Sequence, residues 1–441
     1  MKVLKFGGTS VGNAARIKHV GGLISERKGN LVVLSAMSGV TNTLTEISDY
    51  LYKNNIPGAQ DTLNALEMKY QGVVAELYDD AKWADEALSV IGNSVGYIRA
   101  LIQGDFAVAE EKEILAQGEL VSTALLLNHL KERGLNAVML PALEFMRTDH
   151  NGEPDMKYIS TRLLRMLDMT EEADVYITQG YICRNAYGEV DNLKRGGSDY
   201  TASLIGAVLE SEEIQIWTDI DGMHNNDPRY VEGTRPVGEL NFEEAAELAY
   251  FGAKILHPNC VLPAKLNNIP VRLLNTLEPS APGTVIYNLP PDGDIKAVAA
   301  KDGITAINIK SGRRLVAYGF MHKVFETFEN HKTGIDILAT SEVGITVAID
   351  NDTRLADIVD DLKMFGTVSV DQDMVIISVV GDLHWHHAGL AVRALHALED
   401  IPVRLVSYGG SNYNISVVIP KDFKVQALRK LSEHLFNSNP Q

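Results

Sequence analysis

The 441-residue sequence is poor in cysteine, in positive charge and in long hydrophobic runs. Its two cysteines, Cys183 and Cys260, stand singly and give neither a disulfide framework nor the spacing of a zinc site. No stretch of about 18 apolar residues occurs, so no membrane span and no membrane partner are expected. The 40 basic and 58 acidic residues give a net charge of −18, which argues against a nucleic-acid surface. Because the first expected strand starts at Lys2 or Val3, with no leader before it, we expect a cytoplasmic protein.

What the sequence does contain is an alternation of short apolar runs and helical stretches through its first half. The apolar runs are nearly continuous in Val, Ile and Leu, which is typical of strands covered on both faces, and they predict an α/β fold with a doubly covered, mostly parallel sheet. The expected strands are Val3–Phe6, Leu31–Ser35, Ala137–Leu140, Val175–Gln179 and Ile214–Trp217, and the main helical stretches run from about Asn42 to Leu130 and from Asp199 to Leu209. Ligands of such sheets bind at the carboxyl ends of the strands.

The composition changes near residue 290, where Pro, Gly and Asp gather in a turn or linker. Beyond it, one succession of strand, helix and two strands occurs twice, about 70 residues apart. The first copy covers 304–349 and the second covers 374–419. Two small α+β modules are therefore expected after the linker.

Two glycine pairs stand beside a basic residue, in "KFGGTS" (5–10) and in "KRGGSDYTA" (194–202). Backbone N–H groups of a glycine pair can approach an anion closely, so Lys5 and its glycines predict a phosphate cradle; the alternative is a tight turn with an exposed lysine. Arg195 stands at a helix start, where it suits a bidentate grip on a carboxylate or phosphate. Ser198 or Asp199 would also serve as a purely structural N-cap.

Other segments carry weaker signals. "SAMSGVT" (35–41) follows a strand and by itself is expected to be a plain turn. "WTDIDGMHNNDPR" (217–229) suits the ribose and phosphates of a nucleotide; the alternative is a calcium-like loop, although the spacing does not match an EF-hand. Glu119, on a helix, is by itself expected to be solvated, and Lys254 to complement a helix dipole. "HWHH" (384–387) has no Cys or acidic partner arranged around it and is not expected to hold a metal.

These segments come without a Ser-His-Asp set or a Cys-His pair. Phosphoryl transfer needs no such nucleophile, because positioning and charge stabilisation do most of the work. A hydroxyl acceptor would require a general base nearby. A carboxylate acceptor, with a pKa of roughly 4, is already ionised at neutral pH and needs only an arginine to hold it.

Together with "QGELVS", "FGAKILHP" and "ATSEV", the segments stand in the order found in aspartate kinases (aspartokinases), and the sequence resembles that family over nearly its entire length. The resemblance implies an amino acid kinase fold followed by two ACT-type (ferredoxin-like) regulatory modules, in a monofunctional member of the family. The implied boundaries are 1–290 for the kinase domain, 298–370 for the first ACT module and 371–441 for the second.

The resemblance also implies the site residues. Lys5, Arg195 and Asp199 are implied to be catalytic, with Lys5 stabilising charge on the transferred group. The residues implied to bind aspartate are Thr41, Glu119, Arg195 and Ser198, where Arg195 would hold a carboxylate and Glu119 the ammonium. The residues implied to bind nucleotide are Lys5, Phe6, Gly7, Gly8, Thr218, Asp219, His224, Arg229, Lys254 and Ile255. His224 stands where several relatives have a tyrosine.

The implied reaction transfers the γ-phosphoryl group of ATP, with Mg²⁺, to the side-chain carboxylate of L-aspartate, and it opens the route to lysine, threonine and methionine. Two alternatives are another amino acid kinase, acting on glutamate or a nucleotide, and a non-catalytic amino acid sensor that uses the tail alone. A homodimer through the ACT modules is also implied.

Feedback inhibition by an amino acid effector is expected at the first ACT module. The residues implied to line that site are Gly319, Phe320, Met321, Asp336 and Ser341. Lysine ranks slightly above threonine as the effector. Arg314 and Ala317 stand where lysine-sensitive relatives carry Met and Ser, and an inward-facing arginine would repel a second ammonium.

Overall fold

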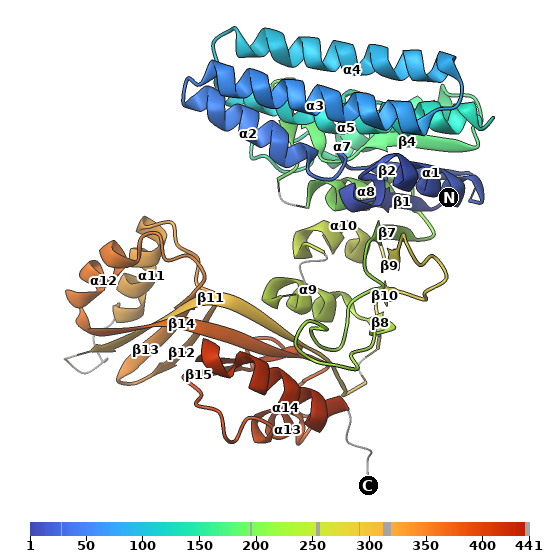
Figure 1. Cartoon of the computed structure of the whole chain (residues 1–441). Helices are drawn as coiled ribbons and strands as arrows, with labels where there is room; N and C mark the ends of the chain where they lie inside the picture. Colours follow the sequence, from blue (N-terminus) through green and yellow to red (C-terminus); the bar gives the residue numbers. More distant parts are fainter. Residues whose placement is uncertain (28, 195, 253–255, 291, 312–318, 437–441) are drawn as a thin grey trace. The chain divides into compact units, whose positions relative to one another are not determined.

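The computed structural model describes residues 1–441 except 28, 195, 253–255, 291, 312–318 and 437–441. Arg195, Lys254 and Ile255 of the predicted kinase site, and Arg314 and Ala317 near the predicted effector site, therefore lie outside the described residues. The chain divides into two compact units (Figure 1). Unit 1 comprises 1–222 and 256–288, and unit 2 comprises 223–255 and 289–441.

Unit 1 is built on a mostly parallel sheet, which confirms the predicted α/β class. Its strands lie in the order β3-β4-β2-β1-β7-β9-β10. They are β1 (Val3–Phe6), β2 (Asn30–Leu34), β3 (Ala137–Met139), β4 (Val175–Gln179), β7 (Ile214–Thr218), β9 (Val271–Asn275) and β10 (Thr284–Ile286), with a separate hairpin of β5 (Ile182–Arg184) and β6 (Val190–Asn192). The five expected strands are present, whereas β9 and β10 were not predicted. Arg272 interrupts the apolar run of β9, and its guanidinium is satisfied by Glu213 at 3.0 Å.

Helices cover both faces of this sheet, as predicted. Leu4 and Phe6 of β1 share one hydrophobic core with residues of α1 to α5, and Figure 1 shows α3 and α4 as long rods running side by side. Lys5 alternates with these residues and reaches α8 on the opposite face. The helices are α1 (Ala14–Ser25), α2 (Val40–Tyr52), α3 (Ile56–Leu77), α4 (Ala81–Ile102), α5 (Val108–Glu132), α6 (Ala142–Phe145), α7 (Met156–Asp168), α8 (Gly197–Val208) and α10 (Leu262–Leu266), with 3₁₀ turns η1 (Gly8–Val11) and η2 (Pro258–Val261).

Unit 2 contains an antiparallel sheet in the order β12-β13-β11-β14-β16-β15. The predicted repeat is confirmed, because both copies show strand, helix, two strands and a further helix. The elements are β11 (Ile295–Ser311), α11 (Phe320–Asn330), β12 (Ile337–Ser341), β13 (Gly344–Ile349), α12 (Leu355–Lys363), then β14 (Gly366–Gly381), α13 (Leu390–His396), β15 (Leu405–Tyr408), β16 (Asn414–Pro420), η3 (Lys421–Phe423) and α14 (Lys424–Phe436). Before them come β8 (Glu239–Leu240) and α9 (Phe242–Phe251).

The two repeats of unit 2 are interlocked through their long strands. The first half of β11, 295–301, pairs with the second half of β14, and the second half of β11 pairs with the first half of β14. Figure 1 shows both strands running the length of the sheet. Separate hydrophobic cores lie around Val347 in one half and Val417 in the other. Each module therefore contains a strand segment from the other repeat.

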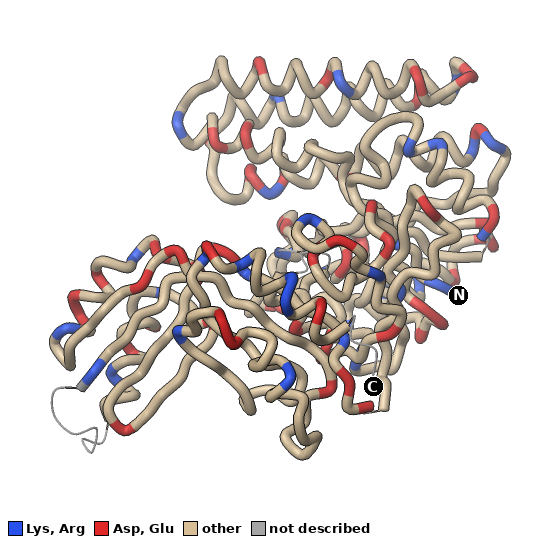
Figure 2. The backbone as a smooth tube through the Cα atoms, turned by 60° about the horizontal axis from the view of Figure 1, so that its bottom comes forward, with Lys and Arg blue, Asp and Glu red and all other residues tan. Residues whose placement is uncertain are grey.

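Charged residues are mixed along the chain, and Figure 2 shows Lys and Arg interspersed with Asp and Glu rather than gathered in one segment. Among the described residues, no helix is both long enough and apolar enough to cross a membrane. Cys183 and Cys260 are both free and buried, and burial raises the pKa of each thiol to about 12.

Candidate active site

A cavity of about 480 Å³ opens in unit 1 beyond the carboxyl ends of the parallel strands. Strands β1, β2 and β4 run in the same direction, so the residues that follow them meet at one edge of the sheet. The cavity is lined by Lys5, Ser35, Thr41, Glu119, Tyr181, Lys194, Gly196, Gly197, Ser198 and Asp199. Of the predicted catalytic and aspartate-binding residues, all except Arg195, which is not described, line this one cavity.

Lys5 and Asp199 form an ion pair in the wall of the cavity. The ammonium of Lys5 lies 2.6 Å from Asp199 Oδ1, and both side chains are about nine-tenths buried. Lys5 reaches Asp199 because it points to the α8 face of β1, between two residues that point to the other face. An ideal Cβ on Gly7 would lie 3.5 Å from Lys5 Nζ, so the ammonium sits directly against this glycine. The alternative, a tight turn with an exposed lysine, is therefore wrong about the exposure of Lys5.

The second glycine after β1, Gly8, is required by a close backbone approach. A Cβ on Gly8 would lie 2.7 Å from the carbonyl oxygen of Ala36, in the loop after β2. The amide of Ser38 donates to the carbonyl of Gly8 at 3.1 Å, which fixes the two loops together. The loop after β1 and the loop after β2 are therefore held as one wall beside the cavity.

The N-terminus of α8 faces the same cavity without a side-chain cap. Its N-cap is Gly196, with φ of 75°, and within the described part of the chain no side-chain cap hydrogen bond is made there. Asp199 is not the N-cap that its sequence position allowed: it lies in the first helical turn and pairs with Lys5. Uncapped amides at a helix N-terminus are ready donors for an anion. This end of the cavity therefore has both the backbone donors and the lysine charge that a phosphate would require.

The environment of Glu119 differs most from what the sequence predicted, because by itself this residue was expected to be solvated. Its side chain lies on α5, is only 3 % exposed and points at the loop after β2, where Oε1 accepts from the backbone amide of Ala36 at 3.2 Å. Within the described part of the chain, Oε2 is buried and has no hydrogen-bond partner. Burial raises the pKa of this carboxyl to about 8. A buried carboxylate oxygen beside a polar cavity is suited to receive a cation.

Three further lining residues, Ser35, Tyr181 and Lys194, were not predicted as site residues. Tyr181 follows β4 with φ of 66°, an unfavourable conformation for a non-glycine residue that is found at functional sites. Ser35 is fixed to α5 because Ser122 donates to its carbonyl at 2.8 Å. Lys194 belongs to the glycine-rich segment 194–202, and its positive charge there could have predicted it as a site residue.

The predicted nucleotide-binding residues are divided between the units. Phe6 is buried in β1, and Thr218 ends β7 with its hydroxyl 3.1 Å from Asp219. His224 and Arg229 belong to unit 2, where the guanidinium of Arg229 is bound by Asp227 at 2.6 Å. Because Lys254 and Ile255 are not described, these assignments stay predictions.

The predicted effector residues all belong to unit 2. Gly319 is the N-cap of α11 in a left-handed conformation, Phe320 is buried, Met321 is exposed and Ser341 ends β12. Asp336 lies between α11 and β12, and its side chain is 4 % exposed. The roles of all five residues stay predictions.

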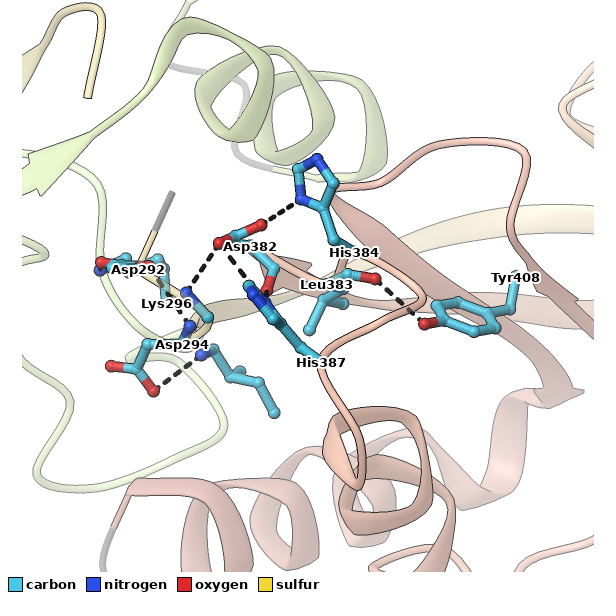
Figure 3. Close-up of polar contacts among 10 residues, drawn as sticks. Asp292, Asp294, Lys296, Asp382, Leu383, His384, His387 and Tyr408 are labelled. Atoms are coloured by element: carbon cyan, nitrogen blue, oxygen red, sulfur yellow. Dashed lines mark hydrogen bonds and ion pairs between the residues drawn. The ribbon is translucent and has the colours of Figure 1, made fainter. Parts of the chain in front are cut away.

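The "HWHH" segment does have an acidic partner, contrary to the sequence reading. Figure 3 shows His384 and His387 on the two sides of Asp382, which is buried at the end of β14. The amide of Gly293 also donates to Asp382 at 2.7 Å. Across the described ranges, no group of three or more His, Cys, Asp or Glu side chains could hold a metal ion. Asp382 therefore joins the end of β14 to the segment before β11, and the two histidines hold its carboxylate.

Comparisons with known proteins agree with this architecture. The pattern of the amino acid kinase family matches residues 1–275, and that of the ACT domain matches residues 377–435. Lysine-sensitive aspartokinase 3 of Escherichia coli is 30 % identical over 454 residues, covering 98 % of this chain and 99 % of that protein. Chloroplastic aspartokinase 1 of Arabidopsis thaliana is 33 % identical over 460 residues, covering 97 % of this chain and 79 % of that protein.

Solved structures give the same result. The structure of E. coli aspartokinase III in complex with aspartate and ADP (R-state) has a TM-score of 0.83 at 29 % identity and covers 99 % of this chain and 100 % of that one. The complex of the same enzyme with lysine and aspartate (T-state) has a TM-score of 0.82 at 30 % identity and covers 99 % of each chain. This chain therefore belongs to the amino acid kinase family and, within it, to the aspartokinases.

Proposed function

We propose that this protein transfers the γ-phosphoryl group of ATP to the side-chain carboxylate of L-aspartate, giving 4-phospho-L-aspartate and ADP. The observation that carries the proposal is that one cavity of unit 1 brings together Lys5, Asp199, the uncapped start of α8 and the buried carboxylate of Glu119. Cationic and amide donors at one place suit a phosphoryl group, and a buried anion suits the ammonium of an amino acid.

In the proposed reaction, a carboxylate oxygen of aspartate forms a bond to the γ-phosphorus, and the bond from that phosphorus to the bridging oxygen of ADP breaks. The acceptor needs no general base because it is already ionised. Lys5 stabilises the charge on the transferred group, and Asp199 holds the ammonium of Lys5 in place. The first amides of α8 add backbone donors to the same group.

Aspartate is proposed to bind through its ammonium and its carboxylates separately. Glu119 receives the ammonium on its unpartnered Oε2, and this contact favours the ionised form that burial disfavours. Arg195 is proposed to hold a carboxylate of the substrate, with Thr41 and Ser198 as hydroxyl donors from the cavity wall.

Nucleotide is proposed to bind through the segment after β1 and through Thr218, Asp219, His224, Arg229, Lys254 and Ile255. A Mg²⁺ ion is proposed to arrive on the nucleotide phosphates and would keep most of its waters. Such an ion would neutralise phosphate charge.

The second part of the proposal is regulatory. We propose ACT modules at 298–370 and 371–441 after a kinase domain of 1–290, a homodimer formed through these modules, and inhibition by lysine or threonine at the site of Asp336. Cytoplasmic location is also proposed, in keeping with two buried, free thiols. Light scattering of the purified protein tests the dimer, and fractionation of its host cell tests the location.

Trapping of the acyl phosphate tests the reaction. The protein is incubated with ATP, Mg²⁺ and hydroxylamine, and with aspartate, glutamate or no acceptor. Hydroxamate that forms only with aspartate is the expected result. Formation with glutamate instead would assign a different amino acid kinase, and no formation with either acceptor would leave a sensor without catalysis.

A further inference from the structure

Asp336 is already held by two groups of unit 2. The ammonium of Lys301, on β11, lies 2.6 Å from Asp336 Oδ1, and the hydroxyl of Tyr250, on α9, donates to the same oxygen at 2.9 Å. The pKa of Tyr250 is raised by burial and by this hydrogen bond to a carboxylate, so the phenol stays a donor at neutral pH. This carboxylate of the proposed effector site thus already binds one ammonium, that of Lys301.

The other oxygen of Asp336 is used differently. Oδ2 is buried and has no hydrogen-bond partner within the described residues. The whole side chain is only 4 % exposed. A buried carboxylate oxygen without a donor costs free energy unless a ligand supplies one. One oxygen of this carboxylate therefore has two donors, while the other has none among the described residues.

Lys301 has a second anion within reach. Its ammonium lies 2.9 Å from Asp350 Oδ2, just after β13, and 4.5 Å from the ring centroid of Tyr250. Burial alone would lower the pKa of Lys301, but the hydrogen bonds to Asp336 and Asp350 raise it. Lys301 thus remains charged and is shared between a buried aspartate and an aspartate that is 48 % exposed.

We infer that Asp336 is a shared carboxylate, whose Oδ1 stays with Lys301 and Tyr250 while Oδ2 receives the ammonium of the amino acid effector. The inference rests on the proposed effector site. Two cations would then face Asp336, and Asp350 supplies the second negative charge that keeps the cluster neutral. Lys301 acts as a built-in competitor that weakens effector binding, and Asp350 strengthens binding by drawing Lys301 toward itself.

From this arrangement we expect substitutions of Lys301 and Asp350 to change the affinity for the effector in opposite directions. Lys301→Met removes the competing ammonium and leaves a buried carboxylate without a cation, so the effector should bind about tenfold more tightly. Asp350→Asn leaves Lys301 dependent on Asp336 alone, so the effector should bind several-fold more weakly. A merely structural ion pair would move both variants in the same direction, or neither.

The experiment measures binding of L-lysine and L-threonine to the full-length protein by calorimetry, together with the rise in Tm that each amino acid causes. Wild type, Lys301→Met, Asp350→Asn and Asp336→Ala are compared. Asp361→Asn is the matched control, because Asp361 is also 48 % exposed and accepts from His331 in the same repeat. Lys301→Met should show the larger effector-induced rise in Tm even if its unliganded Tm is lower.

The possible outcomes distinguish failure of the shared-carboxylate inference from failure of the proposed effector site. If wild type binds neither amino acid, or if Asp336→Ala binds as wild type does, the proposed effector site is wrong. If wild type binds and Asp336→Ala does not, but Lys301→Met is unchanged or weaker, or Asp350→Asn is unchanged or tighter, only the shared carboxylate is overturned. Opposite shifts in the two variants, with Asp361→Asn close to wild type, support it.

Discussion

In unit 1 the ammonium of Lys5 lies 2.6 Å from Asp199, and in unit 2 the ammonium of Lys301 lies at the same distance from Asp336. Both pairs are largely buried, but their surroundings differ. Lys5 lines a cavity of about 480 Å³ beside a glycine and a helix N-terminus. Lys301 lies between two carboxylates and over a tyrosine ring.

The difference indicates what each lysine can do. In the Lys5 pair, the cation and the uncapped amides outnumber the anion at the cavity wall, so a phosphate can still be stabilised there. In the Lys301 pair, two aspartates balance one lysine with a negative charge to spare, so a further cation can be accommodated. The same short contact thus prepares one site for an anion and the other for an ammonium.

The largest effect is expected from Lys5→Ala. The ammonium of Lys5 is proposed to stabilise charge that develops on the transferred phosphoryl group, so kcat should fall about 10²–10³-fold while the fold is kept. The measurement is steady-state turnover with circular dichroism as the check on folding. Lys2→Ala, on a partly exposed lysine in the same N-terminal segment, is the matched control and should stay near wild type. A Lys5 variant with near-native kcat would remove this lysine from the mechanism.

A smaller and more selective effect is expected from Arg195→Lys. Lysine keeps the positive charge but loses the planar fork that grips a carboxylate in two places. The KM for aspartate should therefore rise about tenfold or more, with the KM for ATP little changed. Arg162→Lys, on the exposed side of α7, is the control. A rise confined to ATP would place Arg195 at the nucleotide instead.

Asp336→Ala, which breaks the Lys301–Asp336 ion pair, is expected to weaken inhibition by the effector. Removal of this carboxylate should raise the lysine or threonine concentration needed for half-inhibition by about tenfold or more. Inhibition is measured against the uninhibited rate of each variant, with Asp352→Ala, on an exposed aspartate of the same repeat, as the control. Unchanged inhibition would place the sensor elsewhere, and no inhibition of wild type by either amino acid would leave the modules structural.

Much of the fold was predictable from the sequence because buried parallel strands are nearly pure apolar runs. Strands β1 and β4 were predicted residue for residue, and the internal repeat was found from its order of elements. Short or interrupted strands were missed. The hairpin β5–β6 has only three residues in each strand, and β9 contains Arg272, whose charge is neutralised by a residue far away in sequence.

The candidate sites were predictable only where residues stand in local motifs. The glycine-rich segments located Lys5, Ser198 and Asp199, but nothing in the sequence showed that Glu119 is buried, since its environment is made by the loop after β2. The partners of Asp336 could not be found either. Tyr250 is 86 positions away and Lys301 is 35 positions away, and neither stands in a motif. Tertiary packing alone brings these charges together.

The smallest effect is expected from Glu119→Gln, and it concerns stability as well as binding. The pKa of Glu119 is raised to about 8 by burial, so the folded protein holds a proton that the unfolded chain releases above its ordinary carboxyl pKa. Stability from this group is thus complete below roughly pH 4 and declines as the pH rises toward 8.

Glutamine cannot ionise, and its side-chain oxygen can still accept from the Ala36 amide. The variant should therefore match wild type at low pH and exceed it at pH 8–9, by about 1–3 kcal/mol. Its affinity for aspartate should fall, because the ammonium loses its anion. The check is denaturant unfolding across this pH range without substrate, with the exposed Glu46→Gln as the control. Parallel curves for Glu119→Gln and wild type would mean that Glu119 is already ionised in the free protein, and would contradict a raised pKa for this carboxyl.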